Sequence, residues 1–271
     1  MNGAVRWIFC LTVLVLAFGY TQELTAQSTK QETELRKVED QKEGSSERTA
    51  QTGSEKLYWI FLNTGKSTEG VDPDEVKKMQ KEHLANFKRL AEEEKLLTAG
   101  PMTDPEKMLR GIVIVKASDQ ASLGKMFKPD PFVQKGYLKI EATRMKLEFG
   151  DLNARITPQG LEEYRLVVIE RNNEEANVSE GKAEVSNQQV SAAEIISKLS
   201  QDSDVLLAVS LEASDSNKNK SAVLILSKPE DEKSTASKMK DFPEFKTGQF
   251  RSRVFPLYMG KGTLKPRVPA S

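Results

Sequence analysis

The side chain with the clearest capacity for chemistry is His83, the only histidine in the 271-residue chain. Imidazole exchanges a proton close to neutral pH, so a well-placed histidine can act as a general base or a general acid. His83 occurs in a stripe of apolar residues spaced three and four apart, namely Val76, Met79, Phe87 and Leu90. This spacing predicts one face of a helix. It leaves two readings open: a reactive histidine, or a core histidine satisfied by a backbone carbonyl.

Other kinds of reactive site lack the residues they need. Cys10 is the only cysteine and lies in an N-terminal apolar run, so a processed chain would have neither a disulfide nor a thiol nucleophile. With one histidine and no carboxylate cluster at ligand spacing, we expect no metal site and no cofactor. The sequence contains no Gly-x-Ser-x-Gly nucleophile motif. Gly100, Gly111 and Gly136 fit turns better than a phosphate cradle, because no helix start follows a glycine-rich loop.

Charge and hydrophobicity limit the remaining possibilities. Lys plus Arg and Asp plus Glu both number 40, so the formal net charge is zero. This balance argues against a nucleic-acid-binding protein, which would carry a basic surface. Hydrophobic residues make up only 38% of the chain, so we expect part of it to lie outside any compact domain.

The N-terminal region is predicted to direct export and then to act as a tether. Arg6 precedes an apolar run over residues 7–18, and Ala26 follows after a polar spacer. This pattern predicts a secretory signal peptide over residues 1–26 and a periplasmic or secreted protein, with an uncleaved N-terminal membrane anchor as the alternative. Residues 27–55 are mostly polar and are predicted to be a disordered tether.

The next part of the chain, residues 56–152, predicts an α+β unit. Asp72 and Pro73 form a helix start, with Asp72 as the N-cap, and Ser118 is expected to cap the second helix. The expected elements follow the order strand-helix-strand-strand-helix-strand, which is the ferredoxin-like pattern. They cover residues 56–62, 74–94, 95–99, 109–116, 119–127 and 137–149.

The same order recurs after a predicted linker at 153–162. We expect a second repeat at residues 163–264, followed by a C-terminal tail at 265–271. The expected strands of this repeat cover residues 163–170, 205–211, 222–226 and 250–259. Its expected helices cover residues 189–200 and 229–240. Four pairs of residues share an offset of 112 positions: Pro131 and Pro243, Gly136 and Gly248, Gly150 and Gly262, and Leu152 and Leu264. This regularity indicates an internal duplication. We expect the two sheets to pack against each other within one chain.

Three short motifs resemble the YCII-related (YciI-like) family. They are Lys81-Glu82-His83-Leu84, the segment Leu97-Thr98-Ala99-Gly100-Pro101, and Asp130-Pro131-Phe132. The resemblance implies a dimeric α+β barrel in which two ferredoxin-like units face each other, here as a pseudo-dimer within one chain. It also implies an active site formed by His83 and Asp130. Similar folds include muconolactone isomerases and a dehydrochlorinase.

The second repeat departs from this pattern, because Phe242 stands where Asp130 stands in the first and no second histidine exists. One site at most would keep the pair. A carboxylate beside an imidazole fixes its tautomer and leaves the other ring nitrogen free to move a proton, which suits a lyase or an isomerase. Arg110 or Arg144 could hold a substrate carboxylate.

Two alternatives to this enzyme stay open. Asp130 precedes a proline, so it could simply start a turn. The protein could also be a non-catalytic ligand-binding or scaffolding barrel. The predicted partner is a small-molecule ligand rather than nucleic acid, and further association of chains is left open.

Overall fold

The computed structural model describes residues 55–152, 160–172, 191–213, 219–227 and 232–265. The predicted signal peptide, residues 27–54 of the predicted tether and residues 266–271 of the predicted tail lie outside this part of the chain. Among the residues described, no helix is long and apolar enough to cross a membrane.

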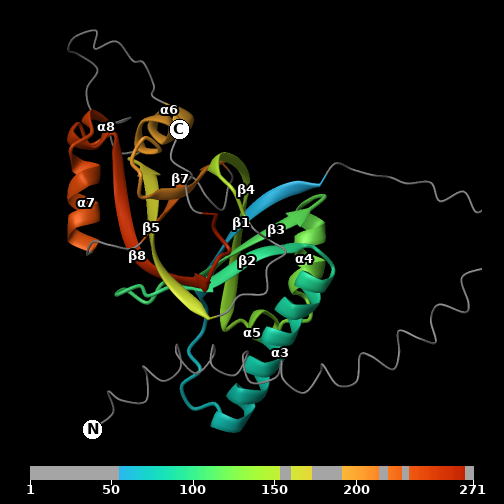
Figure 1. Ribbon diagram of the computed structural model, residues 1–271. Coiled ribbons are helices and arrows are strands. Elements are labelled where there is room, and N and C mark those ends of the chain that lie inside the picture. The colour runs from blue at the N-terminus through green and yellow to red at the C-terminus, as the bar shows by residue number, and fades with distance from the viewer. Residues whose placement is uncertain (1–54, 153–159, 173–190, 214–218, 228–231, 266–271) are drawn as a thin grey trace, which may run out of the picture. The chain divides into compact units, whose positions relative to one another are not determined.

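The described residues form an α+β fold with one antiparallel sheet of eight strands (Figure 1). The strands are β1 (Lys56–Thr64), β2 (Leu96–Pro101), β3 (Leu109–Ala117), β4 (Leu138–Gly150), β5 (Leu161–Arg171), β6 (Val205–Leu211), β7 (Lys220–Ser227) and β8 (Phe250–Gly260). Their order across the sheet is β2-β3-β1-β4-β6-β7-β5-β8. The antiparallel pairing of β4 with β6 therefore joins a first half, β1 to β4, to a second half, β5 to β8.

The helices complete a ferredoxin-like arrangement in each half. The helices are α3 (Pro73–Glu92), α4 (Gln120–Phe127), α5 (Pro131–Gln134), α6 (Ala192–Leu199), α7 (Glu232–Lys240) and α8 (Pro243–Lys246). Each half reads strand, helix, two strands, two helices, strand. The strand order β2-β3-β1-β4 in the first half has its counterpart in β6-β7-β5-β8 in the second.

The two faces of the sheet belong to different cores. In β1, Trp59 and Phe61 join a central cluster that also contains Val168 and Val209 from the second half. The alternate residues Tyr58, Ile60 and Leu62 instead join a cluster with Leu90 of α3 and Phe127 of α4. This alternation follows from the two-residue period of a strand. The helices of the first half therefore cover one face, and the central core occupies the other.

The outermost strands of the sheet, β2 and β8, also touch. Met102, just after β2, forms an isolated antiparallel bridge with Leu257 of β8. The backbone N–H of Thr103 donates to the carbonyl of Pro256 at 3.0 Å. A second bridge joins Leu152 to Leu264, the residues that follow β4 and β8.

Several local expectations are corrected by the structure. The N-cap of α4 is Asp119 rather than Ser118, because the Asp119 carboxylate accepts from the N–H of Ser122 at 2.7 Å. Strand β5 begins at Leu161, inside the segment expected to be linker. The helix expected over residues 189–200 is α6, which is shorter and begins after the N-cap Ser191.

The short helices α5 and α8 were not anticipated at all. The segment around Asp130 was expected to be a turn, yet Asp130 caps four helical residues. The sequence did carry a signal, since Asp130-Pro131 repeats the Asp72-Pro73 pattern that begins α3.

Candidate active site

His83 is placed by the long helix α3. The helix begins at Pro73, and the Asp72 side chain accepts from the N–H of Asp74 at 3.0 Å. His83 lies along the helix between Met79, which packs in a small cluster with Phe132, and Leu90, which packs on the sheet. Its side chain is 12% exposed. The predicted apolar stripe is therefore the buried face of α3, and His83 occupies a slot in it.

Asp130 is placed by the start of α5. Its Oδ1 accepts from the backbone N–H groups of Phe132 at 3.0 Å and Val133 at 3.4 Å. Pro131 occupies the first helical turn, where its missing N–H costs nothing. The Asp130 side chain is completely buried. A buried carboxylate needs hydrogen-bond donors, and the start of α5 supplies two.

The structure brings these two side chains together. His83 Nδ1 lies 2.5 Å from Asp130 Oδ2. Asp130 therefore uses one oxygen for the backbone of α5 and the other for the imidazole. Because a carboxylate only accepts, this geometry assigns the Nδ1 proton to His83 and leaves Nε2 with a lone pair in the neutral ring.

The second ring nitrogen is accessible. Among the described residues, His83 Nε2 makes no hydrogen bond to the protein, and it is not one of the fully buried side-chain atoms that lack a partner. The imidazole thus presents one nitrogen to Asp130 and the other outward. That arrangement is what a general base or acid requires.

Aromatic rings flank the imidazole. The ring of Phe87 lies 4.5 Å from that of His83, and the ring of Phe132 meets it edge-on at 5.7 Å. Phe132 in turn packs edge-on against Tyr137. These rings pack against the imidazole and place apolar surface beside it, so a molecule bound at this point would meet an apolar surrounding.

A polar contact one turn along α3 fixes the helix against α4. The buried Asn86 donates through Nδ2 to the carbonyl of Met126 at 3.2 Å, and Arg89 donates to the same oxygen at 3.0 Å. Met126 is in the last turn of α4, where carbonyls lack helical partners. Sequence analysis missed both residues; the available signal was an asparagine in the buried stripe of a helix.

The two candidate substrate-binding arginines lie elsewhere. Arg110 is exposed on β3. Arg144 is exposed on β4, with its Nε 3.3 Å from Glu212 Oε1. In the described part of the chain, neither arginine forms a hydrogen bond or ion pair with His83 or Asp130. A substrate-binding role for them stays a prediction.

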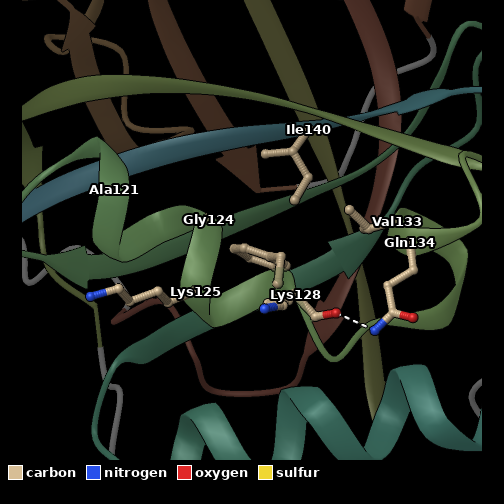
Figure 2. A pocket seen from close by; sticks show the side chains of 8 residues that line it. Ala121, Gly124, Lys125, Lys128, Val133, Gln134 and Ile140 are labelled. Carbon is tan, nitrogen blue, oxygen red and sulfur yellow. Dashed lines mark hydrogen bonds between the residues drawn. The ribbon is translucent and has the colours of Figure 1, made fainter.

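A shallow hollow lies near the segment that carries Asp130, with Lys128 and Val133 among the residues that line it. Its volume is about 420 Å³, and it is formed by α4, α5 and β4 (Figure 2). Phe127, Val133 and Ile140 give it an apolar lining, and Gln134 Nε2 donates to the carbonyl of Lys128 at its edge. His83 and Asp130 do not line it. Within the described residues, no group of three or more potential metal ligands comes together.

Comparison with known proteins bears on the half of the fold that holds this pair. Residues 57–146 match the family model of the YCII-related domain. The match contains both His83 and Asp130 and ends within β4. The predicted resemblance of this segment is therefore confirmed, and the second half lies outside the matched residues.

Comparison with solved structures found a distant similarity in fold. A crystal structure of a candidate monooxygenase from Lactobacillus acidophilus is similar to this chain with a TM-score of 0.43 and 11% identity, covering 79% of this chain and all of the other. A likeness this distant supports no statement about activity. No curated protein matches the chain.

Proposed function

We propose that the YCII-related segment moves a proton on a small organic substrate, with His83 as the catalytic base and acid and Asp130 as its positioning residue. The observation that carries this proposal is the 2.5 Å contact between His83 Nδ1 and Asp130 Oδ2, with Nε2 left accessible. A buried carboxylate held by two backbone amides is a rigid support for an imidazole, and rigidity is what positioned proton transfer needs.

The proposed step begins with the Nε2 lone pair, which takes a proton from a carbon beside a carbonyl. The electrons of the broken C–H bond move into the carbonyl system and give an enolate. If a carbon–carbon double bond is conjugated with the enolate, the imidazolium can return the proton to the far carbon of that system, which completes an isomerisation. If the neighbouring carbon carries a leaving group, this group departs with its bonding electrons as a carbon–carbon double bond forms, which completes an elimination. Asp130 stabilises the imidazolium meanwhile by accepting its Nδ1–H.

The experiment compares substrate turnover in wild type, His83→Gln and Asp130→Asn, using depletion of compounds from a metabolite mixture. Asp72→Asn is a matched control, because Asp72 also caps a helix through its carboxylate but is exposed and does not contact His83. We expect a loss of about 10²-fold or more in the first two variants, the range for a lost general base, and none in the control. A compound consumed equally by His83→Gln would overturn the proposal.

A second candidate function, a non-catalytic binding or scaffolding protein, is favoured by one contact in the second half. There Lys198 of α6 forms an ion pair with the buried Glu244 of α8. This pair also links the first helix of a half to its four-residue helix, and it contains no group suited to proton transfer near neutral pH. A polar pair at this place can therefore join two helices without taking part in proton transfer. Ligand binding that survives His83→Gln, without any turnover in wild type, would favour this reading.

We also propose that the halves are ferredoxin-like repeats that close into an intrachain dimeric α+β barrel. Support comes from the repeated element order, the shared central core and the β2–β8 contact. The glycines of the 112-residue offset agree as well, since Gly136 and Gly248 have φ of 74° and 76°. A Met102→Cys/Leu257→Cys variant should form a disulfide, because bridged strand residues lie close enough for one. Failure to oxidise would count against closure.

We also propose, from the N-terminal sequence alone, that the protein is exported from the cytoplasm. Cleavage after the signal peptide would then release the rest of the chain outside the cytoplasm. Mass spectrometry of the protein recovered from the exported fraction should give a chain that begins at about Gln27. Recovery only of a chain that retains the apolar run would favour the membrane anchor instead.

A further inference from the structure

Two polar side chains lie next to each other in the central core, on strands β1 and β4. Trp59 and Thr143 are direct partners in the β1–β4 register. Trp59 and Met145 belong to the central cluster, whereas Ala142 belongs to the helix-side cluster. Since side chains alternate along a strand, Thr143 faces the central core together with Trp59. This location is on the face of the sheet opposite to α3, the helix that carries His83.

Neither polar atom has a partner in the part of the chain that the structure describes. Trp59 is completely buried and Thr143 is 2% exposed. Among the described residues, Trp59 Nε1 and Thr143 Oγ1 are buried side-chain atoms without a hydrogen bond. Leaving such groups unpaired is unfavourable, and in native proteins they are generally satisfied by ordered water or by a ligand. The N–H of Trp59 can only donate, so it needs an acceptor, and an oxygen atom is the usual one.

A polar cluster lies one step further along the same face. Phe61 is paired with Glu141, so Glu141 points to the same side as Thr143. Glu141 accepts from Asn63 Nδ2 at 3.2 Å and forms an ion pair with Lys220 of β7. The side chains of Glu141 and Lys220 are 15% and 17% exposed, respectively. Polar groups therefore extend from the solvent at this end of the strands to the buried Thr143.

We propose that Trp59 and Thr143 form an internal binding site for an oxygen atom. The Trp59 Nε1–H donates to this oxygen, and the Thr143 hydroxyl donates to it or accepts from it. The oxygen belongs either to an ordered water molecule or to a hydroxyl or carbonyl group of a small ligand that enters past Glu141 and Lys220. The site is separate from His83 and Asp130, so it does not depend on the proposed proton transfer.

The most direct test is a high-resolution crystal structure of the full chain. We expect electron density at about 2.7–3.2 Å from both Trp59 Nε1 and Thr143 Oγ1. A compact, isolated peak identifies water, and density that extends toward Glu141 identifies a ligand. The absence of any peak within reach of both atoms overturns the proposal.

Nuclear magnetic resonance gives a second test in solution with Thr143→Val, which keeps the shape of the side chain and removes its hydroxyl. The Trp59 indole resonance, assigned in a Trp7→Phe background, should show a cross-peak to water in the water-filled case and should shift in the variant. The melting temperature should stay the same or fall, because the bound oxygen loses a partner. Thr235→Val, a buried threonine of α7, should leave the indole resonance in place. A higher melting temperature with an unmoved indole resonance in Thr143→Val would mean that the hydroxyl was simply unpaired, and would reject the site.

Discussion

Asp130 hydrogen-bonds to His83 and, with its other oxygen, to the backbone amides that begin α5. One carboxylate therefore joins α3 to α5 through two residues that are 47 positions apart in the sequence. The short helix holds the carboxylate, and the carboxylate holds the ring. Asp130 therefore has a structural role, as the cap of α5, and a proposed chemical role, as the partner of His83. Different substitutions of Asp130 can test the two roles separately.

Asp130→Ala should destabilise the protein more than Asp130→Asn. Alanine removes the cap of α5 and leaves His83 Nδ1 without its acceptor, which should cost about 1–3 kcal/mol in the free energy of unfolding. Asparagine keeps a capping oxygen and should cost less. Urea unfolding of both variants measures the difference. Equal stability of the two would show that the cap contributes nothing.

Asn86→Ala should weaken the contact between α3 and α4 and lower the free energy of unfolding. The variant removes the Nδ2 donor to the Met126 carbonyl and leaves Arg89 as its remaining side-chain partner. We expect a loss of about 1–2 kcal/mol in the free energy of unfolding, as for other buried hydrogen bonds. Lys88→Ala, an exposed position on the same helix, is the control and should change stability by less than about 0.5 kcal/mol. Similar losses in both variants would argue that the Asn86 contact is unimportant.

The Lys198–Glu244 pair should make stability depend on pH in the acid range. The hydrogen bond from Lys198 holds the pKa of Glu244 below the ordinary value of 4.5. A depressed carboxyl pKa contributes stability that is present above the unfolded-state pKa and is lost as pH falls through the lower folded-state pKa. At pH 7 the wild type should therefore have a higher melting temperature than Glu244→Gln, and this difference in melting temperature should shrink below about pH 4.5. A difference in melting temperature that persists unchanged at pH 3 would contradict a stabilising role for the ionised Glu244.

Leu166→Ala should destabilise both halves together. Leu166 of β5 is completely buried in the central cluster that also contains Trp59. Truncating a buried leucine costs about 2–5 kcal/mol. In a Trp7→Phe background, Trp59 fluorescence reports the first half, and its unfolding transition should move although the substitution lies in the second. Leu161→Ala, at a residue that is 42% exposed, is the control. A Trp59 transition unaffected by Leu166→Ala would mean that the halves unfold separately.

The elements that the sequence predicted well were those with a strong local pattern. Apolar spacing placed α3 and set His83 on its buried face, and the near-continuous apolar run at residues 111–115 predicted β3. The α+β class follows from the order of such elements, and the structure confirms it. Local patterns failed for α5, because a four-residue helix is too short to show a period.

The pairing of His83 with Asp130 could not be read from spacing, because the two residues are 47 positions apart and β2, β3 and α4 lie between them. Only the family resemblance suggested it. The contact of Asn86 with Met126 was invisible for the same reason, as it depends on how α3 meets α4. Arg144 was a plausible anion-binding residue by type, but its place on β4 sets it beside Glu212.

The most direct test of the central claim is the ring-nitrogen spectrum of His83, which is simple to assign because the chain has one histidine. We predict a neutral ring that carries its proton on Nδ1, with a spectrum that changes in Asp130→Asn. A neutral ring that carries its proton on Nε2 and is unaffected by Asp130→Asn would contradict the proposed base.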